Sequence, residues 1–332
     1  MPTVAPLDCP AHVERAAWLG DGAAFACADG TVRITGGADV VAHDGLTVAA
    51  PHDGGLLTGG EDGAVRFVRR DGSLETLHGG DDGGDDWIDA VASGPRGTVA
   101  WSVGKRLSVR TGDGALHQLD HERTVEGIGF APKGLRVAAA RYGGVDAHWP
   151  LGGASDHYHW DGAHLAASFS PDGAFLVSVC AENALHGWRL ADRVDMRMRG
   201  YPSKVRDLSW SSWRKGDRWL ATAGATCAVL WPFDALKGAR SKGGGPMGRE
   251  PLLLGERADQ LTHAVACHPT EPTTAIGYRD GLVLMARHTD GAEVMLRRPS
   301  RGAVTSLAWH PDGTRLAFGT QAGEAGTIDL TS

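Results

Sequence analysis

The stretch Trp309-His310-Pro311-Asp312-Gly313, close to the C-terminus, decides how the chain is organised. Proline presets φ at the start of a tight turn and glycine accepts the positive φ at its end, so Pro-Asp-Gly joins two β-strands. A second clear copy is Phe169-Ser170-Pro171-Asp172-Gly173. Each copy continues with a strand of small and apolar residues, a short Asp/Gly turn and a third β-rich strand. The motif therefore predicts a repeated antiparallel β unit.

Six further segments fill the same position with weaker copies of this turn. They are Gly20-Asp21-Gly22, His52-Asp53-Gly54, Gly94-Pro95-Arg96-Gly97, Phe130-Ala131-Pro132-Lys133-Gly134, Trp210-Ser211-Ser212 and His268-Pro269-Thr270. The copies recur at a mean spacing of about forty residues, which is the length of one four-stranded propeller blade. The sequence thus predicts an all-β protein, a β-propeller of eight four-stranded blades. Seven blades are the alternative, because the first, second and seventh copies are weak.

The two ends of the chain are expected to complete one blade together. In the fifth copy, residues 164–169, 174–179, 184–189 and 194–199 are predicted as the innermost to the outermost strand. The last copy reaches Ser332 with three strands, and Thr3-Val4-Ala5-Pro6-Leu7 can supply its fourth strand. Pairing of this kind removes the exposed edges that an open array would leave. We therefore expect a single domain over residues 1–332, with a flexible, basic and Gly-rich insertion at 235–250 in blade six.

Several of these features resemble the WD40-repeat family. The family places a His before the innermost strand and a Trp on the third strand, in addition to the Pro-Asp-Gly turn. The matching histidines are His12, His43, His164 and His263, and the matching tryptophans are Trp149, Trp188 and Trp231. The Trp-Asp dipeptide of the family is replaced by Trp188-Arg189 and Trp231-Pro232. The segment 219–233, with the later Gly245-Pro246-Met247-Gly248, is similar to a group of bacterial WD-repeat proteins.

The resemblance implies a buried hydrogen-bonded set in the better copies. In the family it joins the His, a Ser or Thr on the second strand, an acidic residue in the following turn and the Trp. The matching residues are His164, Ser178, Glu182 and Trp188 in the fifth copy and His43, Thr58 and Asp62 in the second. A buried polar network is stable when each donor and acceptor has a partner, so a structural role is expected for these residues.

A metal site is the alternative role for histidine in this chain. His157 and His159 are two residues apart, which places both imidazoles on one face of a β-strand. His-x-His supplies two ligands, and His164, Cys180 and Cys227 are candidates for a third. Zinc would be the cofactor, but neither a CxxC nor a HExxH pattern supports it. The first expectation is a protein without a cofactor.

Composition excludes several classes of protein. A net charge of -7 gives no overall attraction to nucleic acid, and the five cysteines are odd in number and lack a CxxC motif. A signal-peptide pattern and an apolar stretch of membrane-spanning length are both absent, so a cytoplasmic protein is expected. The sequence also lacks GxSxG, P-loop and kinase motifs, and it has no GxGxxG that opens a helix. We therefore expect a protein that is not an enzyme.

A binding surface is expected where the connections between strands meet. The connections between blades, and those between the second and third strands of a blade, emerge at the same end of a propeller. Arginine and tyrosine in these connections are typical of protein interfaces. The expected surface residues are Lys105, Arg106, Arg123, Arg141, Tyr142, Arg199, Tyr201, Lys204, Tyr278, Arg279 and Arg301. The sequence thus predicts a scaffold, a monomer within a larger complex, that binds a protein or peptide partner. A metal-binding propeller is the alternative function.

Overall fold

A computed structural model describes residues 2–79, 86–214, 217–233 and 244–331. These residues form thirty β-strands and one short 3-10 helix, η1 (Pro95–Gly97). None of the helical structure in the described residues is long and apolar enough to cross a membrane. Two stretches lie mostly outside the described residues. They are the predicted insertion at 235–250 and the acidic stretch Asp81–Asp86.

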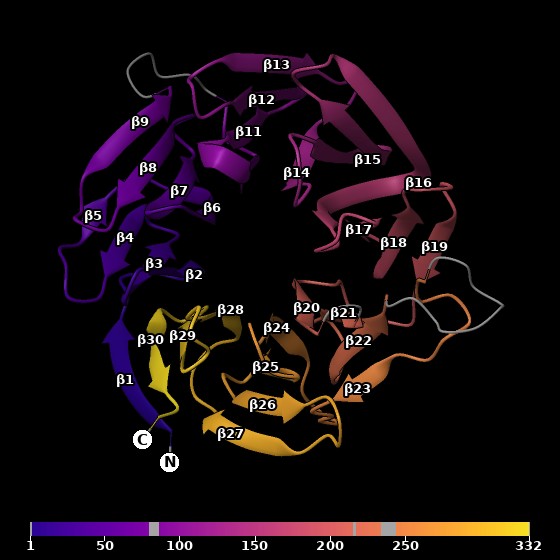
Figure 1. The fold of residues 1–332 in the computed structure, drawn as a ribbon. Helices are drawn as coiled ribbons and strands as arrows, with labels where there is room; N and C mark the ends of the chain where they lie inside the picture. Colours follow the sequence, from indigo (N-terminus) through magenta and orange to yellow (C-terminus); the bar gives the residue numbers. More distant parts are fainter. Residues whose placement is uncertain (1, 80–85, 215–216, 234–243, 332) are drawn as a thin grey trace. The chain divides into compact units, whose positions relative to one another are not determined.

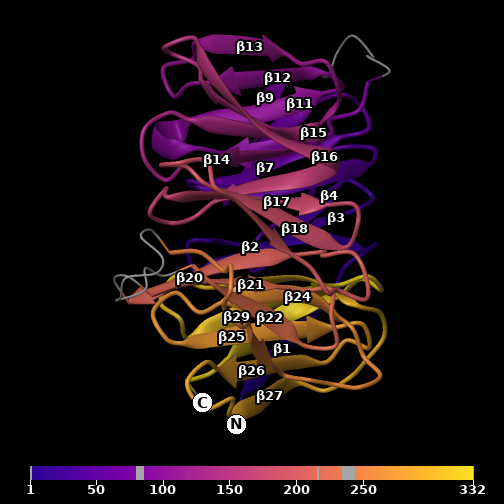
Figure 2. The same cartoon turned by 90° about the vertical axis from the view of Figure 1, so that its right-hand side faces the viewer.

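The chain divides into two compact units. The split unit contains Met1–Phe25 and Met196–Ser332, and the continuous unit contains Ala26–Asp195. Within the split unit, one sheet consists of β20 (Leu208–Arg214), β21 (Asp217–Thr222), β22 (Ala228–Pro232) and β23 (Leu252–Leu254). The next consists of β24 (Thr262–Cys267), β25 (Thr273–Tyr278), β26 (Val283–Arg287) and β27 (Glu293–Arg297). In both sheets, neighbours in sequence are neighbours in space (Figures 1 and 2).

The N-terminal strand completes the last sheet, as predicted. β1 (Thr3–Asp8) pairs antiparallel with β30 (Glu324–Asp329), from Thr3↔Asp329 to Asp8↔Glu324. The sheet continues through β29 (Arg315–Thr320) to β28 (Val304–Trp309). The two termini therefore lie side by side (Figure 1). The predicted pairing of the N-terminal segment with the last repeat is confirmed.

Three further sheets of four strands follow in chain order. The first contains β2 (Val13–Leu19), β3 (Gly22–Cys27), β4 (Thr31–Ile34) and β5 (Val40–Val41). The second contains β6 (Leu46–His52), β7 (Gly55–Gly60), β8 (Val65–Arg69) and β9 (Leu74–His78). The third contains β10 (Ala90–Ser93), β11 (Val99–Val103), β12 (Arg106–Arg110) and β13 (Leu116–Asp120). Strands β3 and β7 are buried along their whole length, which explains their content of Gly and other small or apolar residues.

The fourth and fifth sequence repeats share one sheet of six strands. Its order is β14 (Val125–Phe130), β15 (Val137–Trp149), β16 (Ala154–Phe169), β17 (Phe175–Cys180), β18 (Ala184–Arg189) and β19 (Asp195–Met198). In the described part of the chain, the hydrogen-bonded sheets therefore number seven. The prediction of eight separate blades is wrong as a count of sheets, and the alternative of seven agrees with the structure.

The reason for the shared sheet is that β15 and β16 are long, and that β16 begins ten residues before residue 164, where the innermost strand of the fifth copy was predicted to begin. The first part of β15 pairs with β14, and its second part pairs with β16. Strand β16 likewise pairs with β15 over Ala154–His159 and then with β17 over His164–Phe169. A bridge between Tyr142 and Ala163 connects the two halves, so the pairing is not interrupted.

Strand β15 folds back on itself near its middle. Arg141 Nε lies 2.5 Å from Asp146 Oδ2. In a straight strand the Cα atoms of these residues would be about 17 Å apart, beyond the reach of the two side chains. The bend falls at Gly143 and Gly144, which have φ values of 89° and 136°. Glycine is required at the second position, because a Cβ on Gly144 would lie 2.2 Å from the Tyr158 carbonyl oxygen.

Candidate functional site

Four segments of the continuous unit meet at the ends of their strands, and we call them together the connection surface. They are residues 86–89, 103–106, 121–124 and 141–146. The Asp89 carboxylate accepts a hydrogen bond from the Gly104 N–H at 2.6 Å, which joins the first two segments. The Lys105 carbonyl accepts the His121 N–H at 2.9 Å, which joins the second to the third. The His121 imidazole in turn lies 3.8 Å from the Asp146 carboxylate, in the fourth segment.

The bend in β15 presents Tyr142 to solvent on a rigid support. The Arg141 guanidinium donates to both oxygens of Asp146, at 2.5 and 3.1 Å, and to the Tyr142 carbonyl at 2.9 Å. The Tyr142 side chain is 59% exposed. Because hydrogen bonds already fix the backbone, an aromatic side chain here can contact a partner at a small cost in conformational entropy.

Trp87, a residue that the sequence reasoning missed, is equally exposed at 59%. Its neighbour in sequence, Asp86, lines a pocket of about 350 Å³ that is also lined by both cations of the 103–106 segment. The lining residues are His78, Asp86, Trp101, Val103, Lys105, Arg106, Ser108, Gln118 and Asp120. Arg106 is paired with Asp120 at 2.8 Å, whereas Lys105 is exposed. The sequence did contain a signal for Trp87, because it is an aromatic residue outside any predicted strand and follows the acidic stretch Asp81–Asp86.

Most of the residues predicted for a partner surface are exposed. They are Lys105, Arg106, Arg123 and Tyr142 in the continuous unit, and Arg199, Lys204, Arg279 and Arg301 in the split unit. Arg141 differs, because its side chain is 14% exposed and is held by Asp146. It supports the surface and offers little of its own charge to a partner.

Two tyrosines predicted at this surface are buried, so their assignment to it is wrong. The Tyr201 hydroxyl lies 2.7 Å from Thr222 Oγ1 and accepts a hydrogen bond from Trp231 Nε1 at 2.6 Å. Tyr201 thus forms hydrogen bonds with the second and third strands of its sheet. The resemblance to the WD40 family implied that a histidine makes these contacts. Burial raises the pKa of Tyr201 to about 12. Tyr278 is also inside, and its hydroxyl donates to the Gly255 carbonyl.

The second-copy network has the contacts that the resemblance implied. His43 Nε2 lies 2.9 Å from Thr58 Oγ1, and His43 Nδ1 lies 2.9 Å from Asp62 Oδ1. Arg66 also bonds Asp62, so the buried imidazole contacts a carboxylate whose charge is already paired. Burial lowers the pKa of His43. These contacts are those of a structural residue.

The fifth-copy network is only partly as implied. His164 Nδ1 lies 2.7 Å from Ser178 Oγ, while His164 Nε2 lies 3.0 Å from the Trp160 carbonyl. Glu182 is exposed, and the backbone carbonyl takes the place assigned to its carboxylate. The Trp188 ring is buried near His164, with ring centroids 6.0 Å apart.

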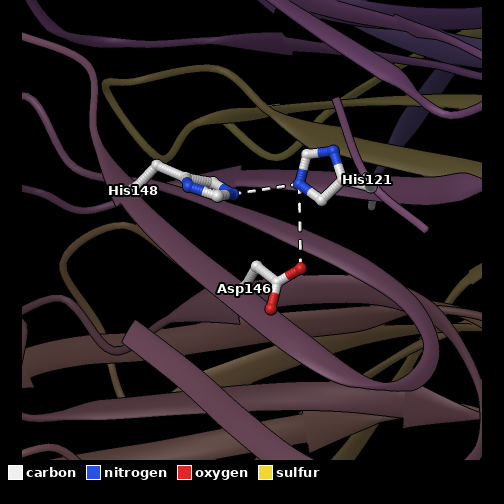
Figure 3. A group of neighbouring side chains, drawn as sticks. All are labelled: His121, Asp146 and His148. Carbon is white, nitrogen blue, oxygen red and sulfur yellow. Dashed lines mark hydrogen bonds and ion pairs between the residues drawn. The ribbon is translucent and has the colours of Figure 1, made fainter. Parts of the chain in front are cut away.

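Two other histidines, His121 and His148, form a compact cluster with Asp146 (Figure 3). His121 and Asp146 belong to the connection surface. Among the described residues, the three that could share a metal ion are His121, Asp146 and His148. The two Nε2 atoms are 2.9 Å apart, and Asp146 Oδ2 lies 3.8 Å from His121 Nε2. His121 follows β13, whereas the other two residues alternate along the second half of β15 and point to the same side.

The surroundings hold this cluster in defined protonation states. Burial lowers the pKa of His121, and it lowers that of His148 to about 4, so both imidazoles are neutral at pH 7. Burial alone would raise the pKa of Asp146. Hydrogen bonds from Arg141 and His157 outweigh that effect and hold its pKa below the ordinary value. The cluster therefore combines two neutral imidazoles with one carboxylate.

The histidine pair predicted as metal ligands has separate partners. His157 Nδ1 lies 2.6 Å from Asp146 Oδ1, and His159 Nδ1 lies 3.1 Å from the Gly143 carbonyl. Of the proposed third ligands, His164 and Cys180 lie beside each other, with Nδ1 and Sγ 3.8 Å apart. Cys227 belongs to the other unit. His157 instead contacts the cluster of His121, Asp146 and His148 through Asp146.

Acidification is expected to destabilise the protein through its buried histidines. Burial lowers the pKa of His148, His263 and His288 to about 4, whereas an unfolded histidine has a pKa of about 6.5. Their contribution is complete above pH 6.5 and is lost as the pH falls toward 4, because the unfolded chain then binds more protons. The expected slope is up to about 1.4 kcal/mol per pH unit for each histidine. Urea unfolding between pH 7 and 4 measures it, and H288Q should show a shallower slope; an unchanged slope would contradict this assignment.

The fold and its repeats define the class of protein to which the chain is similar. It is an all-β propeller built from antiparallel sheets, and residues 295–328, with β28, β29 and most of β30, match the family model "WD domain, G-beta repeat". The resemblance to WD40 repeats is confirmed by this match and by the structures below. Propellers of this type are generally non-enzymatic scaffolds for protein interactions.

Three solved structures share the fold over nearly their whole length. The computationally designed protein Ika8 matches with a TM-score of 0.74 and 18% identity, over 97% of both chains. The WD40 domain of Neurospora crassa Pan2 matches with a TM-score of 0.62 and 11% identity, over 86% of this chain and 89% of that one. A chain of the mitotic checkpoint complex matches with a TM-score of 0.65 and 13% identity, over 99% and 91%. A search of curated protein sequences gave no match.

Proposed function

We propose that this chain is a non-catalytic scaffold that binds a protein or peptide partner at the connection surface. The observation that carries the proposal is the exposure of two large aromatic side chains, Trp87 and Tyr142, on two segments of the connection surface. Trp, Tyr and Arg supply most of the binding energy at protein interfaces. A soluble domain gains nothing in its own stability from aromatic side chains that stay in water.

The charges of the connection surface favour a partner with complementary groups. Lys105 and Arg123 are exposed cations, and Asp86 and Asp120 line the same pocket as Lys105. Alternating signs of this kind set the orientation of a bound peptide more than they set its affinity. The exposed cations of the split unit, Arg199, Lys204, Arg279 and Arg301, are proposed as further partner contacts. We place the scaffold in the cytoplasm, as a monomer within a larger complex.

A displayed random-peptide library tests the proposal, because it samples many peptide sequences at once. Peptides are selected on the wild-type chain, and their dissociation constants are measured for W87A, Y142A and L151A. Leu151 is the control, because it is more exposed than either aromatic residue, at 72%, but lies in the turn that follows Trp149, the last residue of β15. W87A or Y142A is expected to weaken binding at least tenfold, as hot-spot residues do. L151A should leave binding unchanged.

The same experiment can reject the proposal. Peptides whose binding survives W87A and Y142A but fails with L151A would place the binding surface at the turn that contains Leu151. A library that yields no binder of the wild-type chain would remove the support for peptide recognition. Binding of the expected kind should also weaken as salt is raised, since exposed charges are screened.

A further inference from the structure

We infer that His121 and His148 bind a divalent transition-metal ion, with Zn²⁺ as the best-fitting ion and Asp146 as a third ligand. The inference does not rest on the proposed scaffold function, and it differs from the His157–His159 pair that the sequence suggested. It rests on the direction of the two imidazoles, on the chemistry of the third group and on the burial of the cluster.

In each of the two imidazoles, Nδ1 already lies within hydrogen-bond distance of an oxygen atom. His121 Nδ1 lies 3.1 Å from the Leu119 carbonyl and 3.3 Å from the Lys105 carbonyl. Carbonyl oxygens only accept hydrogen bonds, so Nδ1 carries the proton and Nε2 keeps a lone pair. His148 Nδ1 lies 2.6 Å from Ser155 Oγ, which can accept its proton. Metal-ligating histidines are oriented in this way, with one nitrogen bonded to an oxygen and the other directed at the metal.

The Nε2 atoms of His121 and His148 lie at nearly the separation that two ligands of one zinc ion need. They are 2.9 Å apart, and without a metal the neutral pair can form one hydrogen bond, in which His148 Nε2–H donates to His121 Nε2 and Ser155 donates to His148 Nδ1. Two Zn–N bonds of about 2.0–2.1 Å at a tetrahedral angle place the nitrogens about 3.3 Å apart. Entry of the ion therefore requires the rings to separate by about 0.4 Å and the proton of His148 to move from Nε2 to Nδ1, where Ser155 Oγ can accept it.

The state of Asp146 determines which ions fit. Its carboxylate lies near His121 Nε2 but is also held by Arg141 and His157. The guanidinium offsets much of the carboxylate charge, which disfavours Ca²⁺ and Mg²⁺, because these ions are bound mainly by charged oxygen ligands. Imidazole nitrogen is a preferred ligand of Zn²⁺, Cu²⁺ and Ni²⁺. The cluster thus fits a metal held chiefly by nitrogen.

The cluster is shielded from solvent. The side chains of His121 and Asp146 are 2% and 14% exposed. His157, which contacts Asp146, is 41% exposed.

Cobalt titration of the untagged, chelator-treated chain tests the inference directly. One equivalent of Co²⁺ should give the visible absorption of a four-coordinate site, and Zn²⁺ should remove it by competition. H121Q and H148Q are expected to weaken binding at least a hundredfold, and S155A about tenfold through loss of orientation. H159Q is the matched control, because His159 is an exposed neighbour outside the cluster. It should bind as the wild-type chain does.

A second measurement needs no substitution, in case a variant fails to fold. Nitrogen-15 NMR of the wild-type histidines should show Zn²⁺-induced shifts at Nε2 of His121 and His148, and Zn²⁺ should raise the melting temperature. Absence of both the cobalt spectrum and these shifts would overturn the inference. Binding that is lost in H159Q and retained in H121Q and H148Q would overturn it in favour of the His157–His159 pair.

Discussion

Deletion of residues 2–8 should lower the free energy of unfolding by about 5 kcal/mol, far more than loss of an exposed terminal segment would. The segment contains β1, which pairs with β30 over six consecutive positions. Each backbone hydrogen bond contributes about 1 kcal/mol, and Leu7 adds the burial of an apolar side chain against the cluster that contains Val13 and Phe25. Deletion also exposes β30 as a free edge, which is a template for aggregation.

Urea unfolding of the deleted and full-length chains, with light scattering during refolding, measures both effects. V4T in the full-length chain is the control, since this partly exposed side chain can change without loss of the strand. A synthetic peptide of residues 2–8 should restore part of the lost stability, because β1 pairs only through contacts that a separate strand can make. Equal urea midpoints for the deleted and full-length chains would show that β1 contributes little to folding.

The repeated architecture could be predicted because it depends on local chemistry. The Pro-Asp-Gly turn before β29 and the one before β17 need particular residues at particular positions, and those residues are visible in the sequence. The number of sheets could not be predicted. β15 bends at Gly143 and Gly144, and the bridge from Tyr142 to Ala163 carries the hydrogen bonding across this bend. Pairing of that kind joins residues about twenty positions apart and leaves no local signal.

The candidate site was predictable only in outline. Connections rich in Arg and Tyr do form an exposed surface at Tyr142, but Tyr201 and Tyr278 turn inward to hydrogen-bond Thr222, Trp231 and a backbone carbonyl. A sequence shows that a tyrosine lies in a connection, whereas its direction depends on the partners offered by neighbouring strands. The histidine cluster was missed for a related reason. His121 and His148 belong to different repeats, and the bend in β15 brings them together.

Replacement of Gly129 by valine should strongly destabilise the continuous unit. Strand β14 lies so close to the second half of β16 that a Cβ on Gly129 would be 2.3 Å from the Ala167 carbonyl oxygen. Gly127 is equally confined, with the Leu165 carbonyl at 2.5 Å and Ala166 Cα at 2.6 Å. The obstructing atoms are backbone atoms and cannot rotate away, so the two strands must separate.

Overpacking in a well-packed core costs about 1–3 kcal/mol, and here the clash is with backbone that is itself hydrogen-bonded to β17. We therefore expect G129V to lose about 3 kcal/mol or more, and G129A to lose less. G152A is the matched control, because a Cβ there meets only the Trp149 carbonyl oxygen, at an ordinary 3.9 Å. Its unfolding free energy should stay within about 0.5 kcal/mol of the wild-type value. If chemical denaturation showed G129V and G152A to be equally stable, β14 and β16 would have to lie farther apart than in this structure, and the fourth and fifth repeats could not share their inner contact.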